Sequence, residues 1–179
     1  MTDAAAFLRT QSAPTRWPLW GAFASIALLL GALGFEFIGG YPPCPMCYVQ
    51  RWIHVAAAVL GLGLVGAYAF APETRRYARW GAAALGLVFV GSALYAARHA
   101  GIEYGLIEGP ASCTASGGSP NFSLDDLNAA LGAGQRVVLC DEIAWSLFGI
   151  SMAGWNALIS AGLAAVSFVA ASRREEAPA

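Results

Sequence analysis

Four long runs of apolar residues, separated by short polar segments, dominate the pattern of this 179-residue chain. The runs cover residues 17–38, 48–70, 80–97 and 147–171. A helix crosses a bilayer with about 20 mainly apolar residues, and these runs lack the polar face that a helix in a soluble protein keeps. Glycine and alanine recur inside them, and small residues let membrane helices pack closely. The pattern therefore predicts an all-α fold, a four-helix transmembrane bundle.

The composition agrees with lipid as the solvent of this chain. Hydrophobic residues make up 58% of it and charged residues only 12%, whereas soluble domains carry roughly 25% charged residues. The mean hydropathy is +0.57. Tryptophan and tyrosine stand near many ends of the runs, as in the aromatic belts of membrane proteins. All cations are arginines and the net charge is −1, so nothing indicates a nucleic-acid partner.

The arginines predict the orientation in the membrane. Seven of them flank the runs on one side of the predicted bundle: Arg9, Arg16, Arg75, Arg76, Arg79, Arg173 and Arg174. By the positive-inside rule that side is cytoplasmic. The tails at 1–16 and 172–179 are then cytoplasmic, and the loops at about 39–47 and 98–146 face outward. All the cysteines fall in the two outer loops, and disulfides persist in the periplasm and outside cells.

The first outer loop ends in a Cys-x-x-Cys pair, Cys44 and Cys47, followed by Arg51 and His54. Proline is favoured at a first helical position, so we expect a helix to begin near Pro45. Residues three, four and seven apart then share one face, which aligns Arg51 and His54 with Cys47. A helix N-terminus and a nearby cation both lower a thiol pKa. The spacing therefore predicts a thiolate at Cys47 with a positive charge one turn away.

Three uses of the thiols compete with redox exchange. A haem attachment site needs histidine directly after the second cysteine, and Tyr48 stands there. A four-thiolate zinc site normally has two close pairs, but Cys113 and Cys140 lie far apart. Structural disulfides explain Cys113 and Cys140 well, but a Cys-x-x-Cys disulfide tends to be reactive. Redox exchange accounts for both pairs, with a soluble partner facing the loop and a hydrophobic two-electron acceptor, such as a quinone, facing the membrane pair.

Ionisable residues near membrane depth are functional candidates by default. Arg51 is a candidate for the redox site or snorkels to the headgroups. His54 is a candidate for binding the quinone or makes an interhelical hydrogen bond. His99 either acts at the redox site or caps the end of the third helix. Glu36 is interpreted as a boundary residue, and Trp145 and Trp155 as packing residues that could wall a quinone ring. The second loop has the pattern of a short amphipathic helix at about 123–131.

These residues together resemble the DsbB family of bacterial disulfide-generating membrane proteins. The most specific part is Cys44-Pro-Met-Cys47 with Arg51 four residues later. After Cys140, the stretch from Trp145 to Asn156 is similar to the family's start of the fourth helix, with Ala153 where members often have proline. His99 stands where members carry a quinone-contacting histidine.

The resemblance implies an enzyme, a protein-dithiol:quinone oxidoreductase of the bacterial inner membrane. Cys113 would form the mixed disulfide with a periplasmic DsbA-like thioredoxin-fold oxidase, and Cys140 would bridge to Cys44. Cys47 would face the quinone, which is ubiquinone or menaquinone, and Arg51 and His99 would stabilise the thiolate and the developing charge. No metal or haem is expected. The alternatives are an oxidoreductase of the vitamin K epoxide reductase type and a membrane scaffold with structural disulfides.

Overall fold

The computed structural model describes residues 10–110 and 139–173. Four long helices fill this part of the chain: α2 (Trp17–Phe37), α3 (Pro45–Phe70), α4 (Ala78–Glu103) and α6 (Met152–Ser172). Each is long and apolar enough to cross a membrane, the third of them together with the preceding 3-10 helix η1 (Pro72–Tyr77). The predicted four-helix transmembrane bundle is therefore confirmed.

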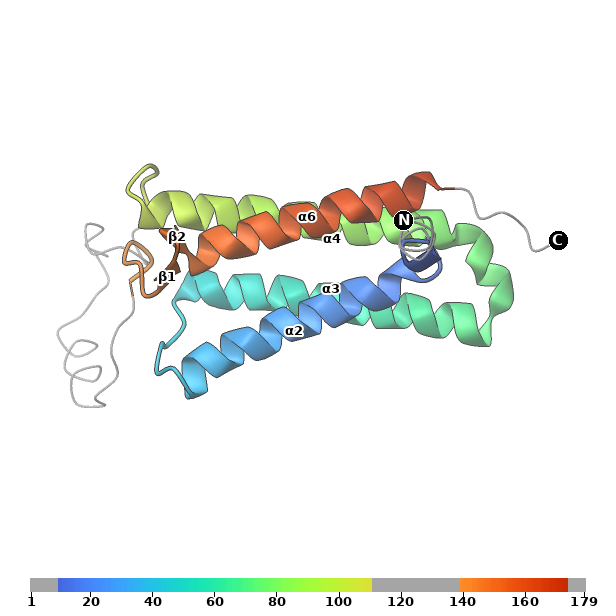
Figure 1. The fold of residues 1–179 in the computed structure, drawn as a ribbon, viewed down its shortest axis with the longest axis horizontal. Coiled ribbons are helices and arrows are strands. Elements are labelled where there is room, and N and C mark those ends of the chain that lie inside the picture. The colour runs from blue at the N-terminus through green and yellow to red at the C-terminus, as the bar shows by residue number, and fades with distance from the viewer. Residues whose placement is uncertain (1–9, 111–138, 174–179) are drawn as a thin grey trace, which may run out of the picture.

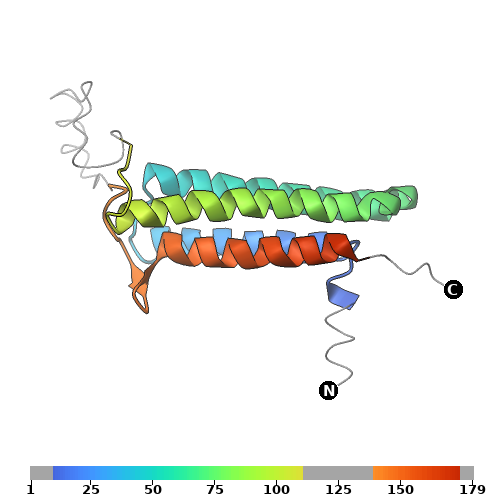
Figure 2. The same ribbon diagram turned by 90° about the horizontal axis from the view of Figure 1, so that it is seen from above.

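The helices form two packed pairs. α4 packs mainly on α6, and α2 packs mainly on α3, with α3 and α4 joining the pairs (Figures 1 and 2). Trp17, Ala57, Leu85, Phe89 and Ala164 form the main buried cluster. The large apolar side chains that remain exposed along the helices are suited to contact lipid rather than water.

Close helix contacts depend on small residues, as expected, but only at some of the glycines. A Cβ atom on Gly61 would lie 2.6 Å from the carbonyl oxygen of Pro18 on α2. No atom of the described residues lies within 4 Å of the same position at Gly63, two residues further along α3. Gly61 is therefore at a helix crossing, and Gly63 faces away from the described part of the bundle.

The end of α4 differs from the sequence expectation. α3 begins at Pro45, as the proline predicts, whereas α4 continues past Ala97 to Glu103. His99 lies inside that helix with 2% of its surface exposed, so it does not cap the helix end. His99 is assigned to a loop by the hydropathy pattern, but Cys44 and Gln50 satisfy its ring nitrogens inside the bundle. The amphipathic helix expected at about 123–131 lies outside the described residues.

The fourth long helix begins later than the expected residue 147, because a small hairpin precedes it. Strands β1 (Ser146–Leu147) and β2 (Ile150–Ser151) pair antiparallel. The two-residue turn has positive φ at Phe148 (53°) and Gly149 (77°), which is the conformation of a type I′ hairpin turn. The Tyr104 hydroxyl accepts from Ser151 N–H and donates to the Gly149 carbonyl, both at 2.8 Å. The hairpin is thereby fixed to the end of α4.

The α2–α3 connection, the end of α4 and the hairpin lie at one end of the bundle, and η1 lies at the other end with the start of α2 and the end of α6 (Figure 1). This arrangement brings the start of α3, the end of α4 and the start of α6 together.

Candidate functional site

The Cys-x-x-Cys pair forms the N-terminus of α3. Cys44 is the N-cap in an extended conformation, and its Sγ accepts a hydrogen bond from the Cys47 N–H at 3.2 Å. Both thiols are free, and their Sγ atoms lie 2.8 Å apart. A disulfide bond is about 2.05 Å long, so the pair needs only a small movement to close when two electrons and two protons are removed from it.

Cys44 is the more acidic thiol of the structure, and Cys47 and His99 are the reason. Its Sγ lies 3.6 Å from Nε2 of His99. The pKa of Cys44 is lowered to about 5. The hydrogen bond from the Cys47 thiol is the largest cause, burial opposes it, and His99 adds to the lowering. The sequence expectation instead placed the thiolate at Cys47, next to Arg51. The more acidic thiol is Cys44 because, as the N-cap residue, it accepts the Cys47 N–H, and because His99 lies beside it. Both contacts favour a negative charge on Cys44.

Arg51 is held between α2 and α3. Its guanidinium forms an ion pair with Glu36 and donates to the Ala32 carbonyl at 3.2 Å. Its Cζ lies 5.5 Å from the centre of the Tyr48 ring. Among the described residues, the polar contacts of Arg51 are made with α2 and not with a cysteine. The sequence analysis expected the Arg51 charge to act on the thiols, whereas its direct partner is Glu36. Both Arg51 and the cysteines line the same cavity.

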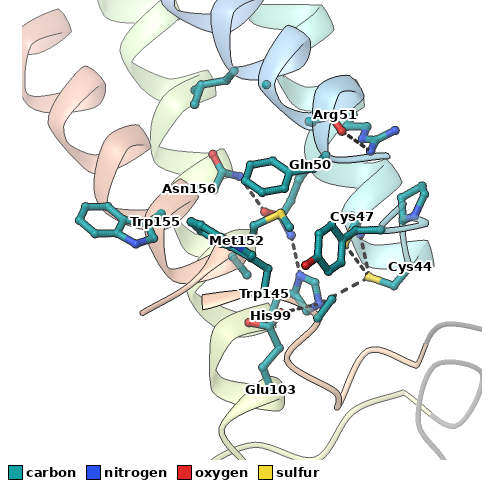
Figure 3. Close-up of a pocket in the computed structure, with 18 of the residues that line it drawn as sticks. Cys44, Cys47, Gln50, Arg51, His99, Glu103, Trp145, Met152, Trp155 and Asn156 are labelled. Carbon is teal, nitrogen blue, oxygen red and sulfur yellow. Dashed lines mark hydrogen bonds and ion pairs between the residues drawn. The ribbon is translucent and has the colours of Figure 1, made fainter. Parts of the chain in front are cut away.

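A chain of buried polar groups leads from the thiols into the bundle. Gln50 Nε2 lies 2.7 Å from His99 Nδ1, and its Oε1 accepts from Asn156 Nδ2 at 2.7 Å (Figure 3). Asn156 Oδ1 is in turn 2.9 Å from His54 Nε2. His54 therefore makes an interhelical hydrogen bond, the structural alternative considered for it, while also lining the cavity. With Gln50 donating to Nδ1, the imidazole of His99 keeps its N–H on Nε2, toward Cys44.

These side chains border a cavity of about 400 Å³. Cys44, Cys47, Arg51, His54 and His99 all line it. The remaining wall is largely apolar and includes Leu28, Phe35, Trp145, Leu147, Met152 and Trp155. Trp145 stacks in a tilted arrangement on Phe35, with ring centres 4.9 Å apart. The two tryptophans considered as possible walls of a quinone site are thus both at the cavity.

Cys140 connects the second loop to the site. It is disulfide-bonded and fully buried. It packs in one cluster with Cys44, Met46 and Ile102. Cys113 lies outside the described residues. A loop cysteine and the membrane-proximal pair therefore meet in the same buried cluster.

Three polar residues of the site were not identified from the sequence. Glu103 was assigned to the loop, but it lies on α4 with Oε1 3.8 Å from His99 Nε2. Gln50 and Asn156 are uncharged and did not interrupt the apolar runs. Gln50 carried a usable signal, since it lies three residues after Cys47 on the same helix face.

Comparison with known proteins agrees with this geometry. The family model described as disulfide bond formation protein DsbB matches residues 14–170. Disulfide bond formation protein B of Methylococcus capsulatus is 31% identical over 84% of this chain and 90% of its own length. The same protein of Stutzerimonas stutzeri is 31% identical over 86% of this chain and 93% of its own length. No solved structure matches this chain significantly. With four membrane-spanning helices and a free dithiol at one end of the bundle, this chain belongs to the DsbB family of membrane disulfide bond formation proteins.

Proposed function

We propose that this protein oxidises the dithiol of a periplasmic DsbA-like thioredoxin-fold oxidase and passes two electrons to a membrane quinone, ubiquinone or menaquinone. The observation that carries the proposal is a free dithiol in the wall of an apolar cavity. Ligand cavities typically measure roughly 300–1,000 Å³, with few polar groups on an apolar wall. The cavity of about 400 Å³ suits an aromatic head group between Trp145, Phe35 and the thiols.

In the first half of the relay, a partner thiolate attacks Cys113 and breaks its bond to Cys140, and the partner's second thiolate then resolves the mixed disulfide. The partner leaves oxidised, and the loop pair is reduced. The Cys140 thiolate next attacks Cys44 of a Cys44–Cys47 disulfide, and Cys47 leaves as a thiolate. Cys113 closes the loop bond again by attacking Cys140, which releases Cys44. The burial of Cys140 against Cys44 supports this transfer.

In the second half, the Cys44–Cys47 dithiol loses two electrons and two protons and becomes a disulfide. The quinone takes up both and becomes a quinol, so the electrons and protons balance. Cys47 is the less buried of the two thiols, which supports a role facing the acceptor. His99 holds an N–H toward Cys44, and Arg51 supplies positive charge at the cavity. Preorganised charge of this kind is a large contribution to many reactions.

We infer that the thiol end of the bundle faces the periplasm across a bacterial inner membrane. Arg75, Arg76 and Arg79 lie at the opposite end, with the start of α2 and the end of α6. The positive-inside rule assigns that end to the cytoplasm. An oxidising compartment then surrounds the loop cysteines, which is where protein disulfides persist.

An anaerobic reaction tests the proposal. The full-length protein in detergent is mixed with a reduced thioredoxin-fold dithiol protein and a soluble quinone analogue, and quinone absorbance is followed. We expect loss of quinone that requires this protein. The matched control replaces Cys44 and Cys47 with serine and should show none. Unchanged quinone with both ubiquinone and menaquinone analogues would contradict the proposal.

A further inference from the structure

The thiol pair and His99 form a cluster with the chemistry of a zinc site. The two Sγ atoms and a ring nitrogen of His99 all lie within 4.8 Å of one another. Two cysteines and one histidine are a ligand set that zinc accepts. Cys44 and His99 are buried and Cys47 is half-buried. The cluster also borders the cavity, which provides a path of approach.

The spacing of the ligand atoms suits tetrahedral coordination. Zinc binds sulfur at about 2.3 Å and histidine nitrogen at about 2.0–2.1 Å, so two such ligands lie roughly 3.5 Å apart around one ion. Cys44 Sγ and His99 Nε2 are 3.6 Å apart. The two Sγ atoms are 2.8 Å apart and would need to separate to roughly 3.8 Å to bind one ion. A rotation of the half-buried Cys47 side chain supplies that separation.

Glu103 provides an independent observation that points to a cation. Its side chain is 8% exposed, and its Oε1 lies 3.8 Å from His99 Nε2. Its Oε2 is buried and makes no hydrogen bond within the described part of the chain. A buried carboxylate oxygen without a partner is costly. An ion bound at His99 Nε2 would lie beside this carboxylate, and a turn of the Glu103 side chain would supply a fourth ligand.

The other nitrogen of His99 is already held by a second residue. Gln50 contacts Nδ1 at 2.7 Å, and histidines that bind metals are usually oriented by such a contact. Metal at Nε2 places the ring proton on Nδ1. Gln50 accepts this proton through Oε1 once its amide and that of Asn156 both turn over, so that Gln50 Nε2 then donates to Asn156 Oδ1. The structure therefore offers the ligands of the site and a residue that orients one of them.

We propose that the reduced protein binds one zinc ion through Cys44, Cys47 and His99, with Glu103 as fourth ligand, and that zinc reversibly blocks the dithiol. Two zinc–sulfur bonds form, the remaining thiol protons leave to solvent, and no electron moves. Sulfurs bound to zinc cannot close a disulfide, and the closed disulfide offers no thiolate. The binding stands on the cluster alone, whereas the inhibition rests on the proposed function.

Cobalt substitution tests the binding without any turnover. The full-length protein carries Cys113→Ser and Cys140→Ser, so that no loop thiol contributes. After anaerobic reduction it is titrated with Co²⁺ alone, and Zn²⁺ is then added as competitor. We expect one equivalent to produce the visible absorption of tetrahedral cobalt and a thiolate-to-cobalt charge-transfer band, both removed by Zn²⁺.

Two comparisons make the result decisive. His99→Ala should weaken binding at least about 10-fold, whereas His54→Ala, which changes the other histidine of the chain, should not. Glu103→Gln should weaken binding as well, and an unchanged affinity would remove Glu103 from the ligands. The proposal is overturned by a reduced protein without a tetrahedral spectrum, by His99→Ala binding like the unsubstituted protein, or by equal binding after the Cys44–Cys47 pair has been oxidised.

Discussion

At the scale of single residues, the two thiols of the site differ in their surroundings although they are one helical turn apart. Cys44 receives hydrogen bonds from the Cys47 N–H and faces the His99 ring. Its pKa is lowered to about 5, first by the Cys47 thiol and then by His99. The reduced pair therefore carries a thiolate on Cys44 near neutral pH.

This asymmetry predicts a pH profile for the metal-free reduced protein. Above about pH 5 Cys44 is a thiolate, and below it the thiol is protonated. The alkylation rate of Cys44 should therefore fall as pH decreases through about 5, rather than through the ordinary thiol value of about 8.5. His99→Ala should move the midpoint upward, and His54→Ala should leave it in place. A midpoint near 8.5 in the unsubstituted protein would contradict this assignment.

The second prediction at this scale concerns Arg51 and its partner Glu36. Losing a hydrogen bond to a charged group costs about 1.5–3 kcal/mol, so Arg51→Ala should raise the apparent KM for the quinone analogue by roughly 10- to 150-fold. Glu36→Gln keeps the guanidinium and removes its counter-charge. If the cation acts at the cavity, Glu36→Gln should change KM far less than Arg51→Ala. An equal rise in both variants would show that Arg51 acts by joining α2 to α3.

At the scale of elements, polar side chains connect three helices where an apolar pattern shows none. Gln50 and His54 on α3, His99 on α4 and Asn156 on α6 form one hydrogen-bonded chain. Asn156→Leu would leave Gln50 and His54 without this partner. Each unsatisfied buried group costs about 1–3 kcal/mol, so the thermal midpoint in detergent should fall.

If Asn156 served only to pack the helices, its replacement would leave the pKa of Cys44 unchanged. The titration of Cys44 is therefore measured together with the stability. Without Asn156, Gln50 is free to turn and His99 loses its fixed tautomer. The titration midpoint of Cys44 in Asn156→Leu should therefore move upward. Ser160→Ala removes a hydroxyl that contacts Asn156 at 3.2 Å and should produce a smaller effect. An unshifted midpoint in Asn156→Leu would restrict Asn156 to helix packing.

Helix packing itself predicts opposite effects at two glycines of α3. Gly61→Ala places a Cβ atom 2.6 Å from the Pro18 carbonyl oxygen and 2.9 Å from Ala22 Cβ. Overpacking of this kind costs about 1–3 kcal/mol. Gly63→Ala meets nothing within 4 Å, and alanine is about 1 kcal/mol better than glycine in a helix. Unfolding in a mixed detergent should be easier for Gly61→Ala and not for Gly63→Ala; the reverse order would contradict the α2–α3 packing.

The helices could be predicted from the sequence because lipid imposes long apolar runs, and Pro45 correctly marked the start of α3. The end of α4 could not be predicted from the sequence, because Arg98 and His99 are polar and suggest a loop. Only the tertiary structure shows that His99 is buried between Cys44 and Gln50. The hairpin before α6 was missed because Phe148, which is not a glycine, takes a positive φ in its turn. At the site, spacing aligned Arg51 and His54 with Cys47, whereas His99 was predicted as an ionisable residue near membrane depth and from the family resemblance. Glu103, Gln50 and Asn156 became visible only when three helices were brought together.

At the scale of the whole molecule, the bundle places a dithiol between two environments. The α2–α3 connection and the hairpin lie at one end of the bundle, and the cavity at the thiols is walled largely by apolar side chains. Cys140 meets Cys44 from the loop side. The fold therefore allows the thiols to exchange with a loop on one side and with a hydrophobic acceptor on the other.

The most direct measurement counts both products of one anaerobic reaction, the partner disulfide and the quinol. The relay predicts one quinol for each partner disulfide in the unsubstituted protein. With Cys47→Ser it predicts no quinol, while a mixed disulfide between the partner and Cys113 still forms. Full quinol production by Cys47→Ser, or repeated partner oxidation by the unsubstituted protein without any quinol, would contradict the account.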